Sequence, residues 1–186
     1  MKISAALVSL CLAAACGGEG EHSATGAGRE PDEYVGCAAD EHWPSFDDAS
    51  DDVSDSDAPQ LTAPSSTAAV ALVPVPDFTW RASAGIAGTT AGDIPMDCAQ
   101  WNTGFSTLHL PPVSGTVYDL QVSIAGKLEH RVITSLQRWT PQASLWASWA
   151  GKSLSIRLRR MTLLENDRKE GPYAPTAPVT LTVSTS

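Results

Sequence analysis

The sequence predicts an all-β fold, namely a single antiparallel β-sandwich with one short helix, over residues 69–186. Apolar and polar residues alternate in several short runs, which is typical of strands with one face in a core and one in water. Clusters of glycine and proline separate these runs. The region holds about 115 residues, the usual size of one domain. These observations together favour one sandwich domain.

Six runs carry this alternation and are expected to form strands. They are residues 77–81, 105–110, 117–124, 128–133, 154–159 and 179–183. The segment Ala125-Gly126-Lys127 lies between two of these runs and predicts a hairpin.

A short helix is expected between Thr140 and Gly151. Thr140 is a suitable N-cap, Pro141 suits the first helical position, and Gly151 suits the left-handed C′ position. Helical spacing then places one apolar group on a single face, namely Leu145, Trp146 and Trp149.

The amino terminus contains a short uncharged segment. Lys2 precedes an uncharged, mostly apolar run from Ile3 to Ala15, which is thirteen residues long. A membrane-spanning helix needs about 20 apolar residues, whereas the core of a signal peptide needs only about 7 to 15. We therefore interpret residues 1–15 as a signal peptide that is removed on export.

The residues that end this run, Leu12-Ala13-Ala14-Ala15-Cys16, resemble the lipobox of bacterial lipoproteins. The resemblance implies that Cys16 receives a diacylglycerol and becomes the first mature residue, so that its acyl chains hold the protein on a bilayer. Ala13 departs from the pattern, because the family most often has leucine there. Secretion with cleavage after Ala13-Ala14-Ala15 is the alternative. Gly17 is not the aspartate that marks inner-membrane retention in enteric bacteria, so the outer membrane is the expected destination within the cell envelope.

Charge divides the mature chain into two unlike parts. Residues 17–64 contain thirteen acidic residues and one base, a net charge of −12, whereas residues 65–186 have eight acids and ten bases, a net charge of +2. A segment with high charge and few apolar side chains cannot offset its chain entropy by burial. Residues 16–68 are therefore expected to form a disordered acidic tether. The segment from Tyr34 to Phe46 is richer in aromatic residues and is a candidate for docking onto the domain.

The acidic run from Asp47 to Asp57 raises the question of a calcium site, because oxygen ligands at alternating positions suit that ion. The run lacks the glycine and the distal glutamate of an EF-hand loop, so a solvated linker is the better interpretation. No metal site and no cofactor are expected.

Four cysteines are encoded. Cys11 leaves with the signal peptide and Cys16 is lipidated, which leaves Cys37 and Cys98. An even number of thiols in an exported protein suggests a disulfide between them. Two free thiols are the alternative, and zinc binding is disfavoured because no CxxC or HxxxH spacing occurs.

Three segments resemble the fibronectin type III and immunoglobulin-like sandwiches. Phe78-Thr79-Trp80 is similar to an early strand with a core tryptophan, residues 117–122 to a central strand with an aromatic residue, and residues 170–183 to the last loop and strand. The loop from Gly85 to Gly104 and the helix at 141–150 depart from the family. The resemblance implies a scaffold for adhesion, spacing or binding, and such a fold does not determine function.

Catalytic motifs are not found, and the four histidines (His22, His42, His109 and His130) are isolated in the sequence. We therefore expect a non-catalytic binding or structural module whose partner is an envelope protein or a glycan. Nucleic acid is not an expected partner at this net charge. The alternatives are an accessory domain of an envelope hydrolase or assembly, a carbohydrate-binding module, or a cryptic enzyme with a site in residues 85–104.

Two groups of residues are candidates for binding. Arg157 and Arg159 are expected on the outward face of a strand, where they could meet a phosphate, an anionic polysaccharide or the acidic tether itself. A glycan would instead require an exposed aromatic platform. Its candidate residues are Trp101, Trp139, Trp146 and Trp149. For the two helical tryptophans, a core position is the competing interpretation.

Overall fold

The computed structural model of the protein describes residues 29–38, 42–65, 69–82 and 113–185. Strands dominate this part of the chain, and the two helices are short. The strands are β1 (Glu33–Val35), β2 (Asp52–Val53), β3 (Gln60–Ala63), β4 (Ala69–Val70), β5 (Phe78–Arg81), β6 (Gly115–Ile124), β7 (Lys127–Thr134), β8 (Arg138–Trp139), β9 (Ser153–Leu164), β10 (Asp167–Ala174) and β11 (Val179–Val183). The helices are α1 (Pro44–Asp47) and α2 (Ala143–Ser148). The predicted all-β class is confirmed.

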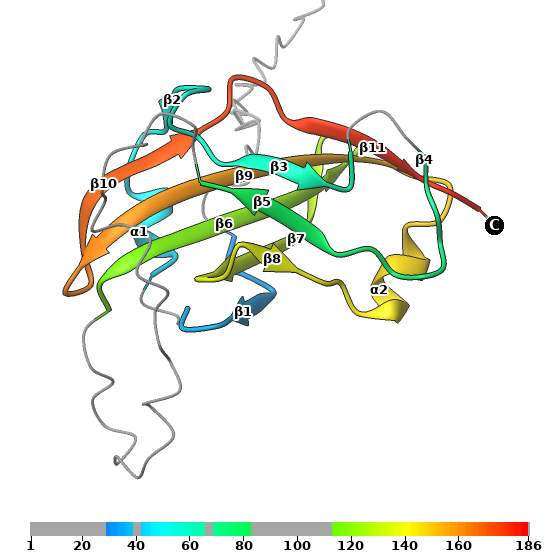
Figure 1. Ribbon diagram of the computed structural model, residues 1–186, viewed down its shortest axis with the longest axis horizontal. Helices are drawn as coiled ribbons and strands as arrows, with labels where there is room; N and C mark the ends of the chain where they lie inside the picture. The colour runs from blue at the N-terminus through cyan, green and yellow to red at the C-terminus, as the bar shows by residue number, and fades with distance from the viewer. Residues whose placement is uncertain (1–28, 39–41, 66–68, 83–112, 186) are drawn as a thin grey trace, which may run out of the picture.

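The strands form two sheets. The larger has eight strands, with the path β1-β7-β6-β9-β10-β2 and with β11 paired to both β9 and β4. The smaller is β3-β5-β8. Figure 1 shows the smaller sheet in front of the long strands β6 and β9, with α2 at one end of the assembly. The central pairs β6–β7, β6–β9, β9–β10 and β9–β11 are all antiparallel, as predicted.

The prediction of a purely antiparallel fold is wrong at the edges of the larger sheet. β1 pairs with β7, β2 with β10 and β4 with β11, and each of these pairs is parallel. All three additions come from the chain before Ala71. Parallel strands cannot be joined by a tight turn, so each addition reaches its partner over a long sequence separation. Strands of two or three residues also carry no alternation that a sequence pattern could reveal.

The first core lies between the two sheets and against α2. Phe78 packs on Trp139 with ring centroids 5.4 Å apart, and Trp80 meets Tyr118 edge-on at 5.6 Å. The buried members of this core are Phe78, Trp80, Tyr118, Leu120, Val122, Val132, Trp139, Trp146, Trp149, Leu154, Ile156, Leu158, Leu181 and Val183. The apolar positions of the predicted alternating runs therefore point into this core, as the period of two requires.

A second core covers the opposite face of the larger sheet. We call residues 29–38 and 42–65 the strap. Its helix α1 lies on that face, whereas β3, near the end of the strap, belongs to the smaller sheet on the other face. Phe46 of α1 is fully buried at 0% exposure. It joins side chains from β6, β7 and β9 and from the segment just before β6, namely Val113, Val117, Ile133, Met161 and Leu163. The predicted disordered tether of residues 16–68 is therefore wrong for the strap. Residues 16–28 and 66–68 lie outside the described part of the chain.

The predicted hairpin turn is present, and the predicted helix is present with a later first residue. Ala125 and Gly126 have φ values of 51° and 82° and connect β6 to β7, which confirms the hairpin. The helix begins at Ala143 with Gln142, not Thr140, as its N-cap. The Thr140 hydroxyl instead donates to the carboxylate of Asp77. The predicted strand 105–110 and the loop 85–104 lie outside the described residues.

Phe46→Ala tests whether the strap belongs to the folded domain. Removing a fully buried phenyl ring is expected to lower the free energy of unfolding by about 3–5 kcal/mol. The matched control is Val53→Ala, because Val53 is in the same strap but 55% exposed; its effect should stay within about 0.5 kcal/mol. Urea unfolding of the full chain measures both. Equal, negligible effects would contradict a docked strap.

Candidate functional site

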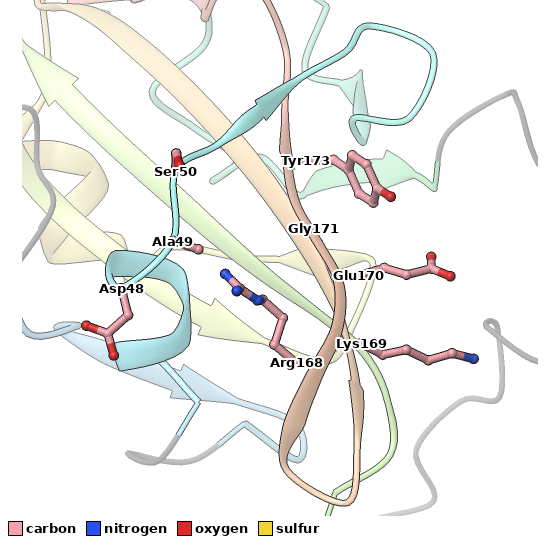
Figure 2. A pocket seen from close by; sticks show the side chains of 8 residues that line it. All are labelled: Asp48, Ala49, Ser50, Arg168, Lys169, Glu170, Gly171 and Tyr173. Carbon is pink, nitrogen blue, oxygen red and sulfur yellow. The ribbon is translucent and has the colours of Figure 1, made fainter.

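A polar hollow opens between the strap and β10. Its volume is about 620 Å³. The residues that line it come from two segments of the chain and are shown in Figure 2: Asp48, Ala49, Ser50, Arg168, Lys169, Glu170, Gly171 and Tyr173. Sites for small molecules commonly have volumes of about 300–1,000 Å³. The hollow is therefore the candidate functional site.

The hollow exists because two paired strands separate. β2 and β10 pair through Asp52 with Tyr173 and through Val53 with Ala174. Before Asp52, the strap turns away from β10 toward α1, whose last residue is Asp47. The stretch of β10 that precedes Tyr173 is thus left without a strand partner on this side, and the hollow occupies the gap.

The shape of β10 also contributes to the hollow. Its pairing with β9 has register shifts on both sides of Glu170. Gly171 has a φ of +84°, and a Cβ atom placed there would lie only 2.7 Å from the carbonyl oxygen of Arg160. Glycine is therefore required at this irregularity. Beyond it, the guanidinium of Arg160 lies 4.7 Å from the ring centroid of Tyr173 and holds that ring in place.

The strap wall of the hollow is held by a buried network of charged groups. Asp119 of β6 lies directly across from Arg159 of β9, and Arg131 is on the neighbouring strand β7. Asp119 accepts a hydrogen bond from Arg131 at 2.9 Å and others from Arg159. Asp119 and Arg131 are both 0% exposed and Arg159 is 5% exposed. Their side chains leave the sheet on the face that the strap covers.

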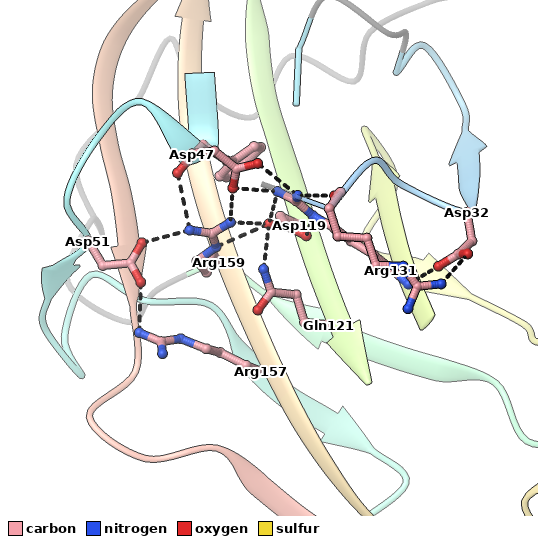
Figure 3. A network of polar contacts seen from close by, with 10 residues as sticks. Asp32, Asp47, Asp51, Asp119, Gln121, Arg131, Arg157 and Arg159 are labelled. Carbon is pink, nitrogen blue, oxygen red and sulfur yellow. Dashed lines mark hydrogen bonds and ion pairs between the residues drawn. The ribbon is translucent and has the colours of Figure 1, made fainter. Parts of the chain in front are cut away.

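The strap supplies the remaining partners of these arginines, as Figure 3 shows. Asp47 accepts hydrogen bonds from Arg131 at 2.9 and 3.1 Å. Asp51 accepts one from Arg159 at 3.0 Å and one from Arg157 at 2.7 Å. The main chain takes part too, because Arg159 donates to the Phe46 carbonyl at 3.2 Å. Two carboxylates of the acidic segment are thereby used to neutralise buried cations.

Electrostatics explain why this burial is tolerated. Burial by itself lowers the pKa of Arg131, but the carboxylates of Asp119 and Asp47 outweigh this effect, so its pKa is raised. The pKa of Arg159 is raised in the same way by Asp119 and Asp51, against the effect of its own burial. Both guanidinium groups stay charged, and each needs its carboxylates. A buried charge without a partner is costly, so strap and sheet depend on each other.

Two predicted binding residues, Arg157 and Arg159, therefore already have partners. They do lie on the face opposite the first core, as the alternation predicts, but the strap covers Arg159 there, and the side chain of Arg157 stays 39% exposed beside Asp51. Of the occupants considered from the sequence, the acidic segment is the one that the structure places there. A role for Arg159 in binding an external anion is contradicted, because its side chain is only 6% exposed.

The tryptophan platform is also wrong for each of its members among the described residues. Trp139, Trp146 and Trp149 are 2%, 0% and 2% exposed and belong to the first core. The indole N–H of Trp146 also has a partner within the domain, because it donates to the carbonyl of Ala71 at 3.2 Å. Trp101 lies outside the described residues. The core interpretation of the two helical tryptophans is confirmed.

His130 connects the start of the strap to the first core. Its ring stacks on Trp139 with centroids 5.5 Å apart, and its two nitrogens lie 3.7 Å from Asp32 and 3.6 Å from Glu33. Glu33 also accepts a hydrogen bond from the Trp139 indole at 3.0 Å. This histidine thus has a structural environment that joins β1 to β7. His109 lies outside the described residues.

Only one of the four cysteines, Cys37, lies in the described part of the chain. Cys37 is 4% exposed and is disulfide-bonded. Cys98 and Cys16 lie outside the described residues, so the pairing of Cys37 with Cys98 and the lipidation of Cys16 stay predictions. Within the described ranges, no group of three or more metal-ligating side chains occurs, and no helix is long and apolar enough to cross a membrane.

The residues that line the hollow were not anticipated from the sequence. The signals there are the acidic run Asp47–Asp57, which was interpreted as a solvated linker, and the charged run Asp167–Glu170. Charged runs are usually solvated, so neither signal by itself indicates a site. Comparisons with protein-family models, with curated proteins and with solved structures each find no match to this chain.

Asp119→Asn tests the network that holds the strap. The substitution keeps the shape of the side chain but leaves two buried arginines undercompensated, and the expected loss is about 3–5 kcal/mol of unfolding free energy. Asp52→Asn is the control, because Asp52 is exposed and forms no ion pair among the described residues; its expected effect is within about 0.5 kcal/mol. Denaturant unfolding compares the two. A loss no larger than that of the control would show that the network is dispensable.

Proposed function

We propose that the protein is a lipoprotein of the cell envelope, anchored through Cys16, whose β-domain is a non-catalytic module that binds or positions another envelope component. The observation that carries the proposal is the uncharged run from Ile3 to Ala15 directly before Cys16. Its length suits a signal peptide and is too short for a spanning helix. The outer membrane is the proposed destination, because the residue after Cys16 is Gly17.

The folded strap changes the expected distance between this domain and the bilayer. From Cys16 to Arg29, the first described residue, there are thirteen residue steps, and even a fully extended chain covers at most about 45 Å over that length. A disordered tether extending to residue 68 would have allowed a much longer reach. The proposed role is therefore that of a module held close to its membrane.

The position of the hollow suits a binding role. Arg29 donates to the carbonyl of Leu128 at 2.7 Å, so the chain enters the domain beside β7. β1 and β7 lie at one end of the path through the larger sheet, and β10 and β2 lie at the other. The hollow at β10 is thus remote from the attachment point. A ligand in it would not compete with the membrane for space.

A fibronectin type III or immunoglobulin-like identity for the domain is part of this proposal. It is supported by two facing sheets and by the burial of Trp80 and Tyr118, at 3% and 1% exposure, in the core between them. These are the aromatic residues of two segments on which the resemblance depends. The parallel edge strands β1, β2 and β4 are additions to that plan. An accessory domain of an envelope hydrolase or assembly is the second candidate, favoured by the same open hollow.

The anchor is tested by labelling cells with palmitate and separating their membranes. The wild-type chain is expected to take up label and to stay with the membrane fraction. Cys16→Ala should lose both properties, because no thiol is then present to accept the diacylglycerol. Cys11→Ala is the matched control, since it removes a cysteine five residues earlier within the same segment, and it should keep both properties.

Unchanged label and membrane retention in Cys16→Ala would contradict the proposed anchor. Loss of both in Cys11→Ala as well would contradict the choice of Cys16 as the lipidated residue.

A further inference from the structure

We propose that the hollow between the strap and β10 is a binding site for a neutral saccharide of a few sugar units. The inference names the ligand class of the module proposed above and rests on that proposed function. It moves the glycan site from the buried tryptophans to a surface that no sequence motif indicated.

The charges that line the hollow balance one another. Arg168 and Lys169 supply two positive charges, and Asp48 and Glu170 supply two negative ones. Such a lining gives no net attraction to an anion or to a cation. It does offer both strong donors and strong acceptors, and sugar hydroxyls can both donate and accept hydrogen bonds. A neutral ligand with many hydroxyl groups therefore matches the lining best.

Arg168 is the donor best placed to meet such a ligand. Figure 2 shows its side chain reaching from β10 toward the strap residue Ala49. The arginines of the network are paired with carboxylates at 2.7–3.0 Å, whereas Arg168 forms no ion pair with any described residue. Its five N–H donors are thus available, and their flat arrangement suits two neighbouring hydroxyls.

The lining disfavours a peptide as the ligand. Peptides usually anchor to a surface through aromatic or aliphatic side chains that enter apolar pockets. Ala49 is the only purely aliphatic side chain that lines the hollow, and the one aromatic residue is Tyr173. A separate apolar pocket near Leu61 and Leu158 has a volume of only about 150 Å³, below the range of about 300–1,000 Å³ usual for small-molecule sites.

Titration calorimetry on the full chain in detergent tests the proposal. The probes are trisaccharides of glucose, mannose, galactose and N-acetylglucosamine, each raised to about 10 mM because exposed polar sites bind weakly. At least one is expected to bind. Arg168→Ala should weaken that binding by about tenfold or more, since a hydrogen bond from a charged donor is lost. Arg138→Ala, an exposed arginine of the smaller sheet, should change it less than twofold.

Glu170→Gln separates a neutral ligand from an anionic one. It removes one of the two negative charges of the lining, so saccharide binding should weaken, whereas binding of inorganic phosphate or glucuronate would strengthen. Urea unfolding verifies that each variant is folded; a variant that is not folded is replaced by Arg168→Gln or Glu170→Asp.

Three results would overturn the site: no trisaccharide binds, Arg168→Ala binds as well as wild type, or only the anionic probes bind. None of them would affect the membrane anchor, because palmitate labelling and membrane retention through Cys16 do not involve the hollow.

Discussion

The pairing of Asp119 with Arg131 and Arg159 is the interaction on which the rest of the structure depends. These three ionised residues project from the same face of the larger sheet, and each is at most 5% exposed. One carboxylate cannot compensate two guanidinium groups, so the remaining charge must come from elsewhere in the chain. Asp47 and Asp51 supply it, and they bring α1 and Phe46 with them. The face of the sheet that carries these charged side chains thereby becomes part of a second core.

The docking of the strap on the larger sheet has consequences for the rest of the molecule. The larger sheet is covered on one face by the smaller sheet and α2 and on the other by α1 and the adjacent part of the strap, so β6, β7 and β9 have buried residues on both faces. Most of the acidic segment becomes part of the domain, and the link to the proposed anchor at Cys16 becomes short. The strap also creates the hollow, because it pairs with β10 only from the start of β2, and the residues before β2 lie away from β10 toward the network. The site that we propose for a saccharide is therefore a by-product of neutralising buried arginines.

Sequence reasoning identified the elements whose pattern is local. Alternation predicted β5, β6, β7, β9 and β11, and Ala125-Gly126 predicted a hairpin that is found. It missed β1 to β4 and β8, which are too short to show a period, and β10, which begins with a charged run. The prediction of a disordered tether is wrong because it rests on the net charge of the segment. Net charge includes Asp47 and Asp51 but does not reveal that they pair with Arg131 and Arg159. Arg157 and Arg159 were placed on the correct face, but the depth of their burial depends on contacts with residues about a hundred positions away.

Hydrogen exchange of the full chain, followed by mass spectrometry, tests the central claim most directly. If the ion network and Phe46 fix the strap to the sheet, the backbone amides of residues 33–35 and those of Phe46 and Asp48 should be protected nearly as strongly as those of β6 and β9, and all of them should open in the same cooperative transition. Exchange of the strap amides at the rate of an unstructured peptide, while β6 and β9 stay protected, would contradict the account.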